Sequence, residues 1–168
     1  MVATAEPWNR RAAGWMARAG FASIAVCIAA AMAASAAGWT VIAAMLHAPW
    51  LFVCHRLPER TLSIAGTPMP LCSRCAGIWL GISLAGALAW PPLPLRVLRV
   101  VVPVAVLVML LDVVLQDTGV HPVWHATRLL TGLLLGVPIG GGVGSVIVAE
   151  LGGPQRPPAS VSPKATIT

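Results

Sequence analysis

Three of the chain's four cysteines, Cys54, Cys72 and Cys75, lie in one connecting segment, "CHRLPERTLSIAGTPMPLCSRC", between two apolar stretches. Cys72 and Cys75 form a C-x-x-C motif across the first turn of an expected helix, so that both thiols can point the same way. The helix N-terminus and the neighbouring Arg74 favour the thiolate form. A glycine and two prolines allow the intervening chain to turn back. We therefore expect the three thiols to lie together.

Three clustered thiolates with an imidazole would form a Cys₃His site, a set typical of structural zinc and suited also to other transition metals. His55 directly follows Cys54, which makes ligation of one ion by both side chains awkward. His125 opens a later apolar helix and is the better fourth ligand on this reasoning. A water in place of the histidine would make the metal site catalytic.

The same cysteines permit two other interpretations. A C-x-x-C at a helix start on an oxidising face is the arrangement of thiol–disulfide oxidoreductases, with Cys54 as the resolving thiol. One structural disulfide beside a spare thiol is the simpler alternative. The fourth cysteine, Cys27, lies in the middle of an apolar stretch and is expected to be a small packing residue.

The composition predicts an integral membrane protein. Hydrophobic residues make up 58% of the 168 residues and charged residues only 10%, and the mean hydropathy is +0.85, whereas a soluble domain carries about 25% charged residues. The net charge of +6 comes from basic residues scattered at the ends of apolar stretches. This pattern argues against nucleic acid as a partner and for contact with the lipid bilayer.

Four apolar stretches approach the roughly 20 residues that a helix needs to cross a membrane. We expect an all-α fold, a four-transmembrane-helix bundle with a cysteine-containing first outer loop. The expected parts are an N-terminal tail (1–18), a four-helix transmembrane domain (19–151) and a disordered, Pro- and Ser-rich C-terminal tail (152–168). The four helices are expected at about Ala19 to Leu46, Leu71 to Trp90, Val97 to Gln116, and Ala126 to Leu151.

The arginines predict the orientation. With four spans, the two tails and the loop between the second and third helices share one side, which carries seven basic residues: Arg10, Arg11, Arg18, Arg96, Arg99, Arg156 and Lys164. The other side carries Arg56, Arg60, Arg74 and Arg128. The positive-inside rule then predicts a multi-pass protein of the inner membrane with both termini in the cytoplasm. The first helix runs well past the length of a signal peptide and is expected to be retained, with cleavage as the alternative.

Nearly all polar residues outside the tails fall at the outer end of the expected bundle. Asp112 and Gln116 are four residues apart and share a helix face. Arg128 lies at a matching depth in the fourth helix, which suggests an Asp112–Arg128 pair. Together with Arg74, these residues would either bind an anionic ligand or cofactor, or tie the helices together.

Small residues recur every four positions in two of the expected helices. The last helix has Gly132, Gly136, Gly140 and Gly144, and the second has Gly77, Gly81, Ala85 and Ala89. Such spacing lets helix backbones approach closely in lipid. We expect these two helices to pack on each other, or one of them to bind a second copy or a membrane partner.

The motifs "CHRLPERT", "PLCSRCAGIWLG", "LLDVVLQ" and "RLLTGLLLG" resemble a prokaryotic family of small multi-pass membrane proteins of unknown function. Its signature is a Cys-His pair, a Cys-x-Arg-Cys-x-Gly motif, an Asp-to-Gln helix end and an Arg-x-x-Thr-Gly helix start, over roughly residues 50 to 140. The resemblance singles out Cys54, His55, Pro58, Arg60, Cys72, Arg74, Cys75, Gly77, Gly81, Asp112, Gln116, Arg128, Thr131 and Gly132. The segment "HPVWHATR" departs from the family's polar loop, which shifts the fourth-ligand assignment toward His55.

A second resemblance is to four-helix membrane oxidoreductases that couple disulfides to quinone. They also have C-x-x-C at an outer helix end, but they use a second cysteine pair, and here only Cys54 is available on that face. The sequence thus predicts a membrane protein with a metal site formed by Cys54, Cys72, Cys75 and His55 or His125. The alternatives are a quinone-coupled thiol–disulfide oxidoreductase and a small structural or accessory subunit.

Overall fold

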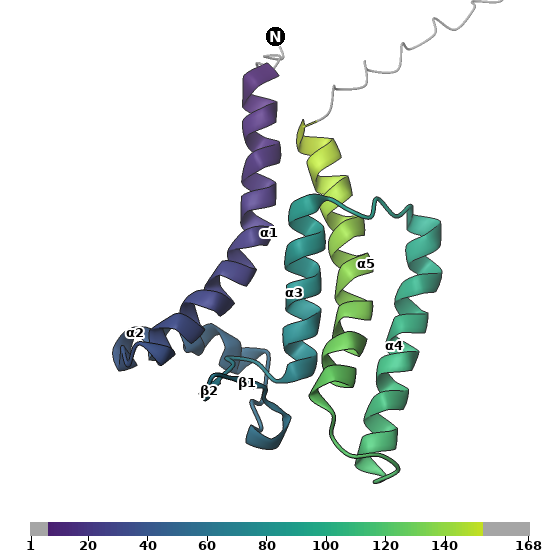
Figure 1. Ribbon diagram of the computed structural model, residues 1–168. Helices are drawn as coiled ribbons and strands as arrows, with labels where there is room; N and C mark the ends of the chain where they lie inside the picture. Colours follow the sequence, from purple (N-terminus) through teal and green to yellow (C-terminus); the bar gives the residue numbers. More distant parts are fainter. Residues whose placement is uncertain (1–6, 153–168) are drawn as a thin grey trace, which may run out of the picture.

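The structure is a computed structural model that describes residues 7–152 and is mostly helical (Figure 1). The described residues form α1 (Pro7–Ala36), α2 (Thr40–His47), α3 (Ser73–Leu88), α4 (Leu95–Asp117) and α5 (His125–Gly152). Short 3₁₀ turns, η1 (Ala48–Phe52) and η2 (Pro58–Arg60), and two short strands, β1 (Ser63–Ile64) and β2 (Thr67–Pro68), connect α2 to α3. The predicted disordered tail lies, apart from Gly152, outside the described part of the chain.

Three helices of the described chain, instead of the expected four, are long and apolar enough to cross a membrane. They are Arg11–Ala36 of α1, Leu95–Asp117, and His125–Leu151 of α5. α3 has 16 residues, a length of about 24 Å at the α-helical rise, which falls short of the roughly 30 Å hydrocarbon core. It nevertheless lies inside the bundle, where it runs antiparallel to α1 and parallel to α5 (Figure 1).

The first apolar stretch differs from the single helix expected over Ala19 to Leu46. The helix α1 starts at Pro7, before the expected boundary, and ends at Ala36. Gly38 follows with a φ of 73°, a left-handed conformation that terminates helices and favours glycine. The chain then changes direction into α2, whose last residue, His47, hydrogen-bonds through Nε2 to Ser35 Oγ at 3.0 Å. The last third of the stretch therefore lies across the end of the bundle (Figure 1).

The predicted packing of the two glycine-bearing helices is confirmed within the chain. A Cβ added at Gly132 would overlap the carbonyl oxygen of Arg74, and one added at Gly136 would overlap that of Ile78. Gly81 of α3 has the same relation to α5, because its Cβ would lie 2.8 Å from the backbone nitrogen of Val137. Gly140 and Gly144 of α5 meet the backbones of Ile82 and Gly86 of α3 in the same way. We call this contact, along Gly77, Gly81 and Gly86 of α3 and Gly132, Gly136, Gly140 and Gly144 of α5, the glycine interface. Any contact with a second copy would have to use another face.

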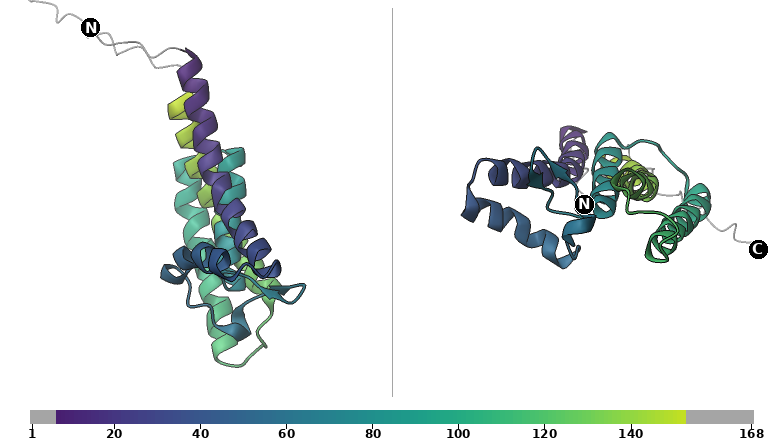
Figure 2. Two further views of the ribbon diagram at one scale, coloured as in Figure 1. Left: turned by 90° about the vertical axis from the view of Figure 1, so that its left-hand side faces the viewer. Right: turned by 60° about the horizontal axis from the view of Figure 1, so that its bottom comes forward.

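A two-residue hairpin between η2 and α3 departs from the all-α expectation. β1 pairs antiparallel with β2, with Ile64 opposite Thr67. The turn residues Ala65 and Gly66 have φ values of 50° and 79°, as in the type I′ turn that matches the twist of paired strands. The hairpin reverses the chain, and it gathers with α2 and the η turns at one end of the helices (Figure 2). We call this end, which also carries the start of α3, the cysteine end.

Candidate functional site

The three cysteines singled out by the sequence lie together at the cysteine end. The sulfur atoms of Cys54, Cys72 and Cys75 are all within 4.8 Å of one another, and all are free thiols. The backbone N–H of Cys72 donates a hydrogen bond to Cys54 Sγ at 3.2 Å. Cys27, in α1, is exposed and outside this group. The expected gathering of thiols from two distant segments is therefore present, and the set is compatible with a metal ion as ligand.

Cys54 is held in place by a backbone hydrogen bond and by packing around Trp50. Its N–H donates to the carbonyl of Trp50 at 3.0 Å, directly after η1. The ring of Trp50 meets that of Trp79 of α3 edge to face, with centroids 6.1 Å apart. Cys54 is only 6% exposed and packs with the buried side chains of Met69 and Leu71. These contacts fix the position of Cys54 relative to the start of α3.

Cys72 is the N-cap residue of α3 and Cys75 lies in its first turn. A hydrogen bond from the Cys75 thiol, with help from the Cys75 backbone N–H and the Cys54 thiol, lowers the pKa of Cys72 to about 5. Burial opposes this shift. One thiolate in the cluster at neutral pH gives it both a nucleophile and a ready metal ligand.

The four polar residues expected around the cysteines are joined in one hydrogen-bonded network. Arg74 forms an ion pair with Asp112, and Gln116 Nε2 donates to Asp112 Oδ1 at 2.9 Å. Arg128 donates through a terminal nitrogen to Gln116 Oε1 at 2.9 Å. The expected Asp112–Arg128 pair is therefore wrong: Arg74 occupies the carboxylate, and Gln116 bridges between Asp112 and Arg128.

The two candidate histidines lie in different surroundings. His125 Nδ1 is 2.7 Å from the hydroxyl of Ser73, which joins the first residues of α5 and α3. His55 is exposed and lines the cavity beside the cysteines. Neither belongs to the group of ligand atoms within 4.8 Å of one another. Sequence reasoning did not identify Ser73, which is fully buried, and a lone serine between two cysteines gives no signal for it.

A cavity of about 330 Å³ opens beside the cluster, and we call it the cysteine cavity. It is bounded by the three cysteines, His55, and Arg56, Arg60, Arg74 and Arg128. Arg56 was not among the sequence candidates. It has a φ of 51°, a left-handed conformation that costs energy for a residue with a Cβ and that no sequence pattern here indicates.

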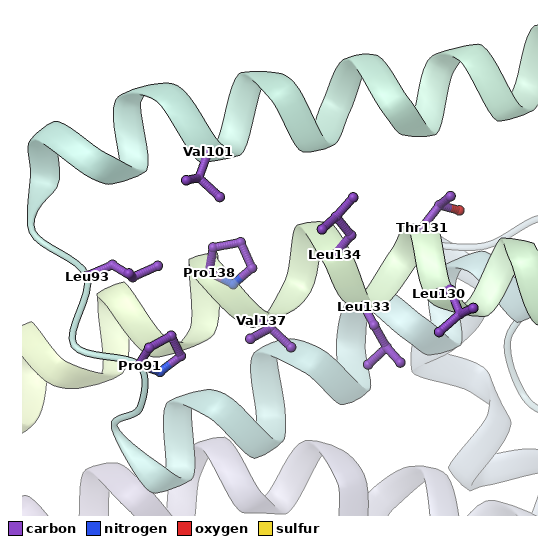
Figure 3. Close-up of a pocket in the computed structure, with 9 residues that line it drawn as sticks. All are labelled: Pro91, Leu93, Val101, Leu130, Thr131, Leu133, Leu134, Val137 and Pro138. Atoms are coloured by element: carbon purple, nitrogen blue, oxygen red, sulfur yellow. The ribbon is translucent and has the colours of Figure 1, made fainter.

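A larger cavity, of about 620 Å³, lies between α4 and α5 away from the cysteines. In Figure 3, Val101 of α4 points toward Leu134 and Pro138 of α5, and Leu93 and Pro91 close one end. Thr131 carries the only side-chain polar group among its lining residues, and that hydroxyl donates to the carbonyl of Arg128 within its own helix. The cavity therefore offers shape and apolar surface but no group for chemistry.

Comparison with known proteins agrees with the membrane assignment. Residues 54–141, just over half of the 168-residue chain, match the family described as predicted membrane protein DUF2085. An uncharacterised protein of Methanocaldococcus jannaschii is 28% identical over 111 residues, covering 60% of this chain and 67% of the relative.

A second uncharacterised protein, from Methanothermobacter thermautotrophicus, is 35% identical over 89 residues, covering 51% of this chain and 79% of the relative. No solved structure shows significant similarity. The matched segment begins at Cys54 and contains the three clustered cysteines, α3, α4, and Gly132, Gly136 and Gly140 of α5. The chain belongs to the DUF2085 family of predicted membrane proteins.

Proposed function

We propose that this membrane protein binds a zinc-like transition-metal ion at its cysteine end through Cys54, Cys72 and Cys75. The observation that carries the proposal is the separation of at most 4.8 Å between any two of the three sulfurs. Zinc–sulfur bonds of about 2.3 Å in a tetrahedron correspond to sulfurs about 3.8 Å apart. Closing this cluster onto an ion thus needs shifts of only about 1 Å.

The charges around the cluster support a metal–thiolate group. Three thiolates and a divalent ion carry a net charge of −1, which is costly to bury alone. This charge would be offset by the four arginines that line the cysteine cavity: Arg56, Arg60, Arg74 and Arg128. Two of them are fixed in place, because Arg74 is hydrogen-bonded to Asp112 and Arg128 to Gln116. The network would thereby keep the metal ligands in position.

His55 is the better fourth ligand of the two histidines. It shares the lining of the cysteine cavity with all three thiols, whereas His125 is engaged by Ser73. A water or another small ligand in that fourth position would give the ion an open coordination site and a Lewis-acid role.

Elemental analysis of the detergent-purified protein tests the metal site. We expect close to one transition-metal ion per chain in the unmodified protein and in a Cys27→Ser variant, because Cys27 lies outside the cluster. A Cys72→Ser variant should lose most of the metal. Metal content near zero in the unmodified protein, or equal content in Cys27→Ser and Cys72→Ser, would refute the proposal.

The lowered pKa of Cys72 favours thiol–disulfide exchange as a second candidate function. Forming a Cys72–Cys75 disulfide would release two electrons and the thiol protons, which a membrane quinone would take up to become quinol. Thiol trapping in intact membranes separates the candidates. A Cys72–Cys75 pair that changes between oxidised and reduced forms with the quinone pool favours the redox function, and a permanently reduced pair eliminates it.

We also propose that both chain ends face the cytoplasm of the inner membrane. The beginning of α1 and the end of α5 lie at the same end of the bundle (Figure 1), and the exposed Arg96 and Arg99 begin α4 there. Positive charge on short loops favours the cytoplasmic side. Green fluorescent protein fused after residue 168 should fluoresce, and alkaline phosphatase fused after Gly119 should be active. The reverse pattern would invert the orientation.

A further inference from the structure

Arginines outnumber carboxylates around the cysteine cavity. Four arginines line it, and the ion pairs of the described residues link Arg74 to Asp112 and Arg60 to Asp117. Arg56 and Arg128 belong to no ion pair within residues 7–152. Glu59, in η2, is exposed and forms no ion pair within that same range. The arginines therefore give the cavity an excess of about two positive charges, which falls to about one with Cys72 as the thiolate.

The excess positive charge includes Arg128, a buried guanidinium without a carboxylate partner among the described residues. It is 3% exposed, and its one side-chain hydrogen-bond partner in the described chain is the neutral amide of Gln116. Its Nε is buried without an acceptor, and the same holds for the Nε atoms of Arg56, Arg60 and Arg74. A buried guanidinium without a paired carboxylate is unfavourable, and a single thiolate elsewhere in the cavity does not satisfy its spare N–H donors. Four guanidinium groups with spare N–H donors around one cavity thus form a ready-made environment for an anion.

We propose that the cysteine cavity binds a phosphate-type oxyanion through Arg128 and Arg56, with Arg74 and Arg60 as further donors. The planar guanidinium donates two parallel hydrogen bonds to the oxygens of such a group. A phosphate offers enough oxygens to accept from several arginines at once, whereas a carboxylate has only two. The anion comes either from a lipid headgroup, since the cavity lies at one end of membrane-spanning helices, or from free phosphate.

Oxyanion binding does not depend on the proposed metal. A thiolate–metal group is the rival counter-charge for Arg128, so the experiment uses reduced, chelator-treated protein, in which that group is absent. If the metal proposal fails, this measurement is unaffected. If the anion proposal fails, the metal content of the untreated protein still decides the metal site.

The protein is purified in dodecyl maltoside, which contains no phosphate, and studied in two arms. In the first, radiolabelled inorganic phosphate is titrated in equilibrium dialysis. In the second, phosphatidylglycerol is added and retained lipid is counted by native mass spectrometry. Binding of phosphate identifies a free oxyanion as the ligand, and retention of lipid without phosphate binding identifies the headgroup.

In whichever arm binds, Arg128→Gln should weaken binding at least about tenfold, the loss of one bidentate charged contact. The control Arg96→Gln removes the same charge from an exposed position at the opposite end of α4 and should change binding less than about twofold. Where Arg128→Gln does not fold, a substitution of the half-buried Arg56, Arg56→Gln, takes its place. No binding in either arm, or equal binding by the arginine variant and Arg96→Gln, would overturn the proposal.

Discussion

The glycine interface and the cysteine end both join α3 to α5, but they do so by opposite means. At the glycine interface the backbones touch, and a Cβ on Gly132 or Gly136 would overlap a carbonyl of the other helix. At the cysteine end, long side chains span the gap, through the Arg74–Asp112–Gln116–Arg128 network. The first arrangement depends on the absence of side chains and the second on their charges. Steric changes should therefore damage one region and charge changes the other.

The two cavities sharpen the contrast. The larger one, between α4 and α5, is lined almost entirely by apolar side chains, while the smaller one gathers the thiols and arginines. Polar side chains inside a membrane protein are costly and are kept where they bind or react. Charge, and not cavity size, is therefore our reason for proposing the cysteine end as the functional end of this molecule.

The largest effect is expected from Gly136→Leu. A leucine there would force its Cβ into the carbonyl of Ile78, and backbone cannot move aside as a flexible side chain can, so α3 and α5 must separate. We expect little or no monodisperse protein on size exclusion after detergent extraction. The matched control is Gly20→Leu in α1, where a Cβ would meet nothing within 4 Å, and this variant should behave like the unmodified protein. Equal yields of both variants would contradict the role of the glycine interface.

The next largest effect is expected from Asp112→Asn. Asp112 is 8% exposed and is paired with Arg74, and removing one partner of a buried pair costs about 3 kcal/mol or more. Asp117→Asn removes the same charge from the exposed pair with Arg60, and surface pairs contribute less than about 1 kcal/mol. Unfolding of both variants in SDS–detergent mixtures measures the difference. Equal destabilisation would mean that the network at the cysteine end does not hold the helices together.

A smaller effect is expected where α1 meets α3. The buried hydroxyl of Ser83 donates to the carbonyl of Phe21 at 2.8 Å and accepts from the N–H of Ala25 at 3.2 Å. Hydrogen bonds between membrane helices contribute on the order of 1 kcal/mol, so Ser83→Ala should destabilise the protein by about that amount. The control is Ser23→Ala, since Ser23 is exposed and bonds only to its own helix at Gly20. A loss of stability as large as that of Asp112→Asn would contradict this estimate, because the Ser83 contact would then hold the helices together as strongly as the charged network does.

The glycine interface could be predicted from the sequence because its signal is local. A four-residue repeat on one helix face requires a close neighbour, and only one other helix, with Gly77 and Gly81, matched it. The clustering of Cys54 with the C-x-x-C motif followed in the same way from chain-turning residues between them. The hairpin itself was missed, since strands of two residues are too short to show an alternating pattern.

The pairing of charges could not be derived from depth alone. Asp112 has Arg74 and Arg128 near its level, and the rotation of each helix decides which one reaches the carboxylate. Likewise His125 looked like a free ligand in the sequence, because nothing indicated that the buried Ser73 would hold it. The early start of α1 at Pro7 was missed because its first turns are polar and lack the apolar signal of a span.

The smallest effect is expected in the rate of Cys72 alkylation, whose pH dependence tests the electrostatics of the cysteine end. The pKa of Cys72 is lowered to about 5 by the Cys75 thiol, so in reduced, metal-free protein the thiolate predominates above that pH and disappears only as the pH falls through it. The iodoacetamide rate at Cys72, followed by peptide mass spectrometry, should be nearly constant between pH 6 and 8. In Cys75→Ala the hydrogen bond is gone, the pKa of Cys72 should rise toward its ordinary value, and the alkylation rate should increase steeply over the same pH range.

The alkylation rates of the two proteins at pH 7 should differ by only a few fold, because thiolates of lower pKa are weaker nucleophiles. A constant rate in both proteins would show that the arginines, and not Cys75, keep Cys72 ionised, and would move the charge that matters from the thiols to the surrounding network.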